Sequence, residues 1–459
     1  MAPRRAVRAL LLLLATLLAL AGCVSLPRSG PVTASDPDLP VPELGLAAAG
    51  PAADADPTAI VQGFLRASAA GLSDDFTVAR EFLAGPAQNT WDPSAQVRVY
   101  ANDPAVEFTT NDDGGVRVRA PAQSSIDDEG RYTESAPGSV IEADFTLART
   151  GGEWRIIDLE DGILLSEPFL VSLYAQRPLY FLSQDGEALV PDVRWYPRRN
   201  LATSLVRGLL EGPSSWLTPA VFTAVPAGTS LTVASVVVQD GVAQVDLSTE
   251  AQATDPATRA LMVAQIEATL RDVPSVRDTR VTVGGSTFDV PAEPDLDRDP
   301  YVSMNPLVVS GGVLAQFTGS PELEPLAGAD QLGVRAPRHP AMGYEENPVM
   351  VLLDGSDRLA AAATESTGPV TLLEGPDLVP PSVDRLGWVW TGPAAAGGPL
   401  RAVRQNGTEV QVGVPWLAGR EVRALRISRD GARAVVVSAT GDAGQVDVAA
   451  VIRDSDGTP

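Results

Sequence analysis

The apolar positions of the chain first follow a helical period and then a strand period. Residues 58–70 place apolar side chains three and four residues apart, after Asp56-Pro57, which supplies an N-cap and a first-turn proline. A second helix is predicted at residues 76–83. Runs that alternate between apolar and polar residues predict strands at 96–100, 116–119, 141–150 and 154–159. Two helices on an antiparallel sheet make a small α+β domain, with either a ligand pocket or, as we favour, a packed core.

The next segment, residues 178–292, also mixes strand and helix patterns. Apolar residues at helical spacing mark 201–210, which ends at Gly212-Pro213, and a second helix begins after Asp255-Pro256. Strands are predicted at 178–181, 189–192, 232–238 and 242–247, and a hairpin at 280–290 turns at Gly284-Gly285. The pattern predicts a second compact α+β module.

Residues 299–459 contain short strand patterns and turns without a helical period. Strands are predicted at 349–353, 359–363, 387–391, 401–404, 409–414, 422–428, 434–438 and 446–453. The turn residues Asp357, Asp384 and Asp430 precede strands, at intervals of 27 and 46 residues. Because these intervals are unequal, the segment is interpreted as an all-β region with a degenerate repeat.

The N-terminus has the pattern of an export signal. Arg4, Arg5 and Arg8 precede an apolar run at residues 9–21, which is shorter than the roughly 20 residues that span a bilayer. The run leads into LAGC at 20–23, which resembles a bacterial lipobox. This resemblance implies cleavage before Cys23 and its modification by an S-diacylglycerol and an N-acyl (palmitate) chain. The alternative is an ordinary signal peptide with a coincidental cysteine, or an uncleaved anchor.

The charge balance narrows the classes of partner. The chain carries 58 acidic and 34 basic residues, a formal charge of −24, which opposes binding to the phosphates of nucleic acids. Anionic lipid headgroups would repel the same surface. Residues 24–57, which are rich in Pro, Ala, Asp and Gly, are therefore interpreted as a tether that holds the folded body away from the bilayer.

Candidate chemistry is sparse. The chain has one histidine, His339, and one cysteine, Cys23, so metal sites built from several histidines or cysteines are excluded. With 58 carboxylates, some pair will lie at glycosidase spacing by chance, so their abundance is poor support for acid–base catalysis. We therefore expect no enzyme, no catalytic residues, no cofactor and no metal. His339 lies in a Pro-rich segment and is predicted to be a solvated loop residue.

Two pairs of residues have alternative interpretations. Asp192 and Asp246 lie in segments with turn signals, where a carboxylate caps backbone amides more often than it binds a ligand. Trp388 and Trp390 alternate on one side of a predicted strand, and we favour core packing there over a platform for a sugar.

Several short sequences resemble known domains. LLEGP at 209–213, VPAGT at 225–229 and VDLS at 245–248 resemble a GerMN domain, and because they are turn and core residues they indicate a fold and not a reaction. LVPD at 189–192 and Arg194-Trp195 further resemble the actinobacterial LpqB lipoprotein family. With the lipobox, this likeness extends over most of the chain.

The LpqB resemblance implies a β-propeller at residues 299–459, and SRDG at 428–431 resembles the turn between two strands of a blade. At about 42 residues per blade these 161 residues give fewer than four blades, so we expect either an incomplete propeller or a truncated sequence. The predicted chain is thus multidomain. It consists of a signal peptide (1–22), a tether (23–57), an N-terminal α+β domain (58–170), a GerMN α+β domain (178–292) and a partial propeller (299–459).

The same resemblance implies a function. Proteins of this family would sit on the extracytoplasmic face of the cell membrane through a lipid anchor. There they would regulate the MtrA–MtrB two-component system by binding the extracellular domain of the sensor histidine kinase MtrB. The alternative is a cell-envelope protein that binds peptidoglycan or another cell-wall glycan.

Overall fold

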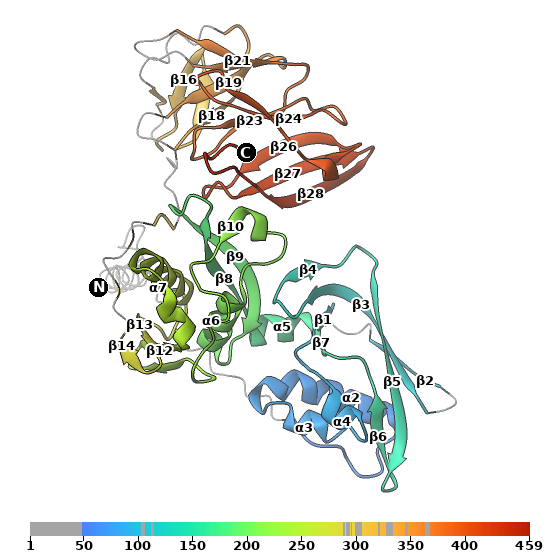
Figure 1. Ribbon diagram of the computed structural model, residues 1–459. Helices are drawn as coiled ribbons and strands as arrows, with labels where there is room; N and C mark the ends of the chain where they lie inside the picture. Colours follow the sequence, from blue (N-terminus) through green and yellow to red (C-terminus); the bar gives the residue numbers. More distant parts are fainter. Residues whose placement is uncertain are drawn as a thin grey trace, which may run out of the picture. The chain divides into compact units, whose positions relative to one another are not determined.

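A computed structural model of the chain, shown in Figure 1, describes residues 48–101, 106–111, 114–287, 290, 294, 296–298, 305–319, 322–326, 334–344, 348–362 and 368–459. All of them belong to the compact unit at residues 45–459. The predicted signal peptide, Cys23 and most of the predicted tether lie outside the described residues. Among the helices that are described, none is long and apolar enough to cross a bilayer.

A seven-stranded sheet forms the first domain. Its strands are β1 (Val97–Tyr100), β2 (Glu107–Thr110), β3 (Val116–Ile126), β4 (Tyr132–Glu134), β5 (Val140–Thr150), β6 (Glu153–Asp158) and β7 (Ile163–Ser166). The main path runs β6-β5-β3-β1-β7, and β2 and β4 each pair with β3. β1 and β7 are parallel, whereas the other pairs are antiparallel. The strands predicted at 96–100, 141–150 and 154–159 are confirmed to within one or two residues, and β3 is longer than predicted.

Helix α2 (Pro57–Ala70) packs its apolar side against this sheet. Asp56 caps the helix as predicted, because its Oδ1 accepts the amide of Ala59 at 2.8 Å. The ring of Phe64 packs edge-on against the rings of Trp91 and Phe145, with distances between ring centroids of 5.1 and 6.0 Å. Buried aromatic and aliphatic side chains therefore fill the space between α2 and the sheet.

The helix predicted at residues 76–83 is wrong in extent. The structure has the single turn α3 (Thr77–Arg80), preceded by Phe76 in a left-handed conformation at φ 59°, and then the short helix α4 (Ala87–Thr90). The chain leaves the helix because Ile156 of β6 bonds the backbone on both sides of Leu83. Its carbonyl accepts the amide of Ala84 at 2.8 Å, and its amide donates to the carbonyl of Phe82 at 2.9 Å. Pairing with the sheet edge outcompetes the local helical pattern.

The second domain combines two sheets and two long helices. The first sheet has the order β10-β8-β9, and the second the order β11-β12-β13-β14, in which β12 and β13 are parallel. The short helix α5 (Glu167–Leu173) leads into β8. The other elements are β8 (Tyr174–Ser183), β9 (Leu189–Pro197), α6 (Leu201–Glu211), β10 (Val221–Phe222), β11 (Val237–Gln239), β12 (Val242–Leu247), α7 (Pro256–Leu270), β13 (Asp278–Val283) and β14 (Ser286–Thr287).

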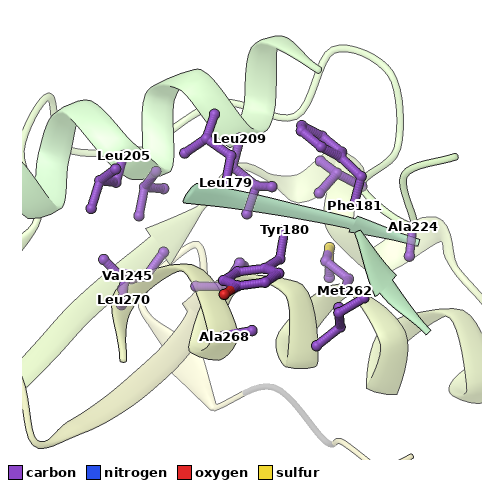
Figure 2. Packing of buried hydrophobic residues seen from close by; sticks show 14 of the residues in the cluster. Leu179, Tyr180, Phe181, Leu205, Leu209, Ala224, Val245, Met262, Ala268 and Leu270 are labelled. Atoms are coloured by element: carbon purple, nitrogen blue, oxygen red, sulfur yellow. The ribbon is translucent and has the colours of Figure 1, made fainter. Parts of the chain in front are cut away.

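The core of this domain lies where α6, α7 and β8 meet. Figure 2 shows Leu205 and Leu209 of α6, Leu179 of β8 and Met262 of α7 within one cluster, and all four are fully buried. Asp255 caps α7 by accepting the amides of residues 257 and 258 at 2.9 and 3.1 Å. The helices predicted from apolar spacing and from Asp255-Pro256 are confirmed.

The strand predicted at residues 232–238 is shorter than expected. β11 begins only at Val237, because the preceding amide, that of Val236, donates to the hydroxyl Oγ1 of Thr203 on α6 at 2.9 Å. An amide held by a helix side chain cannot also join a strand ladder. The turn at Asp240-Gly241 joins β11 to β12.

The C-terminal region is built from small antiparallel sheets. In its described residues the orders are β15-β16-β17, β18-β19-β20-β21, β22-β23-β24-β25 and β26-β27-β28. The strands are β15 (Leu307–Ser310), β16 (Val313–Gln316), β17 (Glu324–Pro325), β18 (Pro337–Met342), β19 (Met350–Asp354), β20 (Arg358–Ala361), β21 (Val370–Glu374), β22 (Ser382–Val383), β23 (Val389–Thr391), β24 (Leu400–Val403), β25 (Glu409–Val412), β26 (Glu421–Ile427), β27 (Arg433–Thr440) and β28 (Ala443–Ala450). This β-rich arrangement confirms the fold class expected for the region.

Candidate functional site

A buried polar cluster lies on β9, around the Asp192 that the sequence singled out. Oδ2 of Asp192 accepts hydrogen bonds from Nη2 of Arg194 at 2.8 Å and from the amide of Ser214 at 2.8 Å. Oδ1 accepts the Ser214 hydroxyl at 3.0 Å, and Nη2 of Arg194 also donates to the carbonyl of Gly212 at 2.7 Å. The side chains of Asp192 and Arg194 are each only 2% exposed.

The geometry of this cluster assigns Asp192 a structural role. Both of its carboxylate oxygens are occupied, and they tie β9 to the loop that follows α6. Burial works against the charge of Arg194, but the interactions with Asp192 and Tyr196 together outweigh burial and raise the pKa of that guanidinium above its ordinary value. We therefore identify the cluster as a clamp on the Gly212-Pro213-Ser214 turn, in agreement with the hydrogen-bonding interpretation of Asp192.

Asp246 of β12 holds the β13–β14 hairpin in a similar way. Its Oδ1 accepts the Thr282 hydroxyl at 2.6 Å and the amide of Gly285 at 2.8 Å. These two hydrogen bonds lower the pKa of Asp246 below its ordinary value. The carboxylate thus fixes the Gly284-Gly285 turn predicted from the sequence, and this contact agrees with the capping interpretation.

The two tryptophans of β23 and its preceding turn belong to a third buried cluster. Both are almost completely buried. Nε1 of Trp390 donates to Oδ2 of Asp384 at 2.8 Å, and the same oxygen accepts Nη2 of Arg453 at 2.6 Å. Oδ1 of Asp384 accepts the amide of Trp388 at 2.9 Å. Buried rings cannot stack on a sugar, so the packing interpretation of Trp388 and Trp390 holds.

His339 is exposed, as predicted for a solvated residue, but it does not lie in a loop. It falls within β18, at φ 49°, where the register against β19 shifts between Arg338 and Ala341. The irregular strand explains the difference, because a bulge accommodates the left-handed backbone that a regular ladder would not.

The structure also shows a cavity that sequence reasoning missed. It lies at the beginning of α6, has a volume of about 360 Å³, and is lined by Arg177, Arg198 and Asn200 together with apolar side chains. The sequence signal was the basic pair Arg198-Arg199 shortly before an apolar helix. Arg177 gave no signal, because only the pairing of β8 and β9 brings it near that helix.

In the described residues, no group of three or more His, Cys, Asp and Glu side chains is arranged to hold a metal ion. The buried carboxylates instead bond to arginines, tryptophan and backbone amides within the same domain.

Comparison with known proteins gives a consistent assignment along the chain. Family profiles match residues 50–170 (Lipoprotein LpqB, N-terminal domain), 178–289 (Sporulation and spore germination) and 312–459 (Lipoprotein LpqB beta-propeller domain). Lipoprotein LpqB from Thermobifida fusca is 30% identical over an alignment of 501 positions, gaps included, which covers 94% of this chain and 79% of that protein. The chain belongs to the LpqB lipoprotein family. The resemblance drawn from short sequences is thereby confirmed.

Other members are similar over comparable lengths. Lipoprotein LpqB from Bifidobacterium longum is 29% identical and covers 89% of this chain and 72% of its own. Among solved structures, the first GerMN domain of the sporulation protein GerM from Bacillus subtilis is 23% identical, covering 27% of this chain and 98% of its own, with a TM-score of 0.23. LpqB relatives are named as lipoproteins and not as enzymes.

Proposed function

We propose that this LpqB-family protein is anchored through lipids on Cys23 to the extracytoplasmic face of the cell membrane, as an accessory regulator of the MtrA–MtrB system. Its partner would be the extracellular domain of the sensor kinase MtrB. Anchoring follows from acyl chemistry, because each buried methylene contributes about 0.8 kcal/mol and several chains together hold a protein stably at the bilayer. The lipoprotein name of the relatives supports this anchor.

One observation favours binding over catalysis as the general role. The buried carboxylates of Asp192 and Asp384 accept hydrogen bonds on both oxygens, from arginines and from nearby amide and side-chain donors. A general acid or base needs a proton or lone pair free for the substrate, and these groups have committed theirs to holding turns. The buried carboxylates of Asp192 and Asp384 therefore stabilise their domains, and the exposed surfaces remain available to bind a partner.

Regulation of a kinase by a bound protein has a thermodynamic requirement. The regulator must bind one state of the sensor domain more tightly than the other, because equal affinity leaves the equilibrium unchanged. Moving the two states from 1:99 to 99:1 would take a difference of roughly 5.5 kcal/mol, and a tenfold difference in affinity already changes their ratio tenfold.

The test uses the acylated full chain and full-length MtrB in one vesicle population. We expect the full chain to change MtrB autophosphorylation and to be co-purified with MtrB after detergent extraction. The matched control is Cys23→Ser, added in solution at the same total concentration, which should bind the kinase but act only at higher concentration because the membrane no longer concentrates it. Unchanged phosphorylation together with no co-purification would refute the proposal.

The same preparation tests the glycan alternative. Incubation with isolated cell wall would retain the full chain if it bound peptidoglycan, and the retained amount would be the same with and without MtrB. Retention on the wall without any effect on MtrB would favour that alternative over the kinase proposal.

A further inference from the structure

We propose that the cavity at the beginning of helix α6 is a binding site for a small ligand that carries an oxyanion, either a phosphate or a carboxylate group. The site belongs to the second domain alone and is independent of both the lipid anchor and the kinase. Its polar side is formed by Arg177 and Arg198, and its apolar side by Leu201, Val236, Val238 and Val273. Two guanidinium groups line this space, and none of its lining residues is acidic.

Arg177 and Arg198 have unused hydrogen-bond donors. Each guanidinium carries five N–H groups in a planar fork that matches an oxyanion. Nη2 of Arg198 donates to the carbonyl of Val171 at 3.2 Å, and Nη1 of Arg177 donates to the carbonyl of Gln176 at 2.9 Å. In the part of the chain that the structure describes, no carboxylate lies within ion-pair distance of either residue. Most of their hydrogen-bonding capacity is therefore unused.

Arg177 carries the more informative atom. Its Nε is buried and has no hydrogen-bond partner among the described residues. Leaving a buried charged donor without a partner costs free energy, and such a group calls for an explanation in a native structure. Since this Nε has almost no accessible surface, the Arg177 side chain would have to turn for an oxyanion in the adjoining cavity to supply the missing acceptor.

The start of α6 adds a second source of positive potential. Asn200 precedes the helix in a left-handed conformation at φ 54°, and its side chain makes no capping hydrogen bond. The first amides of an α-helix have no acceptor within the helix, and the helix dipole places partial positive charge at the same end. Asn200, Leu201 and Ala202 all line the cavity, so this end of the helix faces the proposed ligand.

The charge around the cavity favours an anion in spite of the acidity of the whole protein. The chain has a formal charge of −24, yet no aspartate or glutamate lines this cavity. An anion placed there meets two guanidinium groups and a helix N-terminus, with no carboxylate among the residues that line the cavity. The volume of about 360 Å³ lies at the lower end of the range for ligand pockets, and the four apolar side chains would contact a small apolar portion of the ligand.

The experiment measures binding to the full chain, purified in detergent at low ionic strength, by isothermal titration calorimetry. Three probes are compared, namely inorganic phosphate, N-acetylalanine as a carboxylate with a small apolar part, and uncharged N-acetylalaninamide. Hydrogen exchange with and without the probe locates the contact. We expect one or both anions to bind, the amide not to bind, and protection to increase at residues 198–204.

Variants then assign the binding to the two arginines. Arg198→Gln should weaken anion binding by about tenfold or more, since a hydrogen bond to a charged group contributes roughly 1.5–3 kcal/mol. Arg177→Gln should have a comparable effect. The control is Arg66→Gln on the exposed side of α2, which removes the same charge from another domain and should leave the affinity unchanged. Arg198 is exposed, so its variant is expected to fold even if Arg177→Gln does not.

Each outcome is decisive. Binding of phosphate alone identifies a phosphate ligand, and binding of N-acetylalanine alone identifies a carboxylate ligand. Binding of neither probe overturns the proposal. So does binding that Arg198→Gln leaves intact, or that Arg66→Gln weakens equally, because the anion would then be attracted by general charge and not by this cavity.

Discussion

Removal of the Asp192 carboxylate would isolate a buried arginine. In the variant Asp192→Ala, Arg194 keeps its hydrogen bond to the carbonyl of Gly212 but loses the carboxylate that pairs with it while it is 2% exposed. The amide and hydroxyl of Ser214 lose their acceptor as well. Breaking a buried ion pair by removing one partner typically costs about 3–5 kcal/mol. Because a domain is stable by only about 5–15 kcal/mol, the second domain should become marginal.

Hydrogen exchange monitored by mass spectrometry is the suitable assay. The chain has several domains, so a single free energy of unfolding for the whole molecule is not defined, whereas exchange reports the opening of each segment. Peptides that contain β9 and α6 should exchange faster in the variant by a factor corresponding to about 3 kcal/mol or more. The control Asp144→Ala removes an exposed ion pair with Arg117 in the first domain and should change exchange little.

A double variant separates the loss of an interaction from the penalty of an unpaired charge. Asp192→Leu with Arg194→Met replaces both members of the pair by apolar side chains, and such replacements are often neutral or stabilising. We expect the double variant to be more stable than Asp192→Ala. A change below about 1 kcal/mol in Asp192→Ala, or a double variant less stable than the single one, would refute the clamp at the Gly212-Pro213-Ser214 turn.

Three further predictions follow from other contacts. The pKa of Asp246 in the folded protein lies below its ordinary value of 3.8. The stability that the Asp246 carboxylate contributes is therefore complete above pH 3.8 and is lost as the pH falls through the lower folded pKa. Protection of the Gly285 amide from hydrogen exchange should fall over the same pH range, and Asp246→Asn should not show this pH dependence. Cys23→Ser should abolish palmitate labelling and membrane pelleting of the full chain, and persistence of both would contradict lipidation at this residue. Asp384→Ala removes the acceptor of Trp390 Nε1 and the partner of Arg453. We expect Trp390 to become exposed, with a red shift of the tryptophan fluorescence, and the domain to lose about 3–5 kcal/mol of stability. An unchanged emission maximum would show that Asp384 does not hold this cluster together.

The sequence predicted elements well where a long period coincided with a cap. Helices α2 and α7 have a regular apolar spacing after Asp-Pro, and the structure places both where the pattern indicated. Prediction failed where a tertiary hydrogen bond took a backbone group away from its local partner. Ile156 does this at residues 82–84, and the Thr203 hydroxyl does it at Val236. Neither partner is near in sequence, so no local pattern indicated them.

The candidate sites show the same difference between local patterns and contacts that only the folded domain creates. Capping and packing interpretations of Asp246 and Trp390 were available from the sequence, because turn residues and strand alternation are local signals. The cavity beside α6 was not, since Arg177 on β8 reaches the start of α6 only through the folding of the whole domain. An arginine with an unpartnered Nε is indistinguishable in sequence from one that forms a surface ion pair.

The acidity of the protein constrains how the proposed kinase contact could form. The whole chain has a formal charge of −24, so an acidic folded body is attracted to a basic surface and repelled by an acidic one. The Debye length at physiological ionic strength is about 8 Å, so this preference acts only when the two proteins are already close. An anchor that confines both to one membrane brings them into that range, and charge complementarity then selects the partner face. A sensor domain that responds to this protein should therefore present a basic face to it, and the rate of association should fall as salt increases.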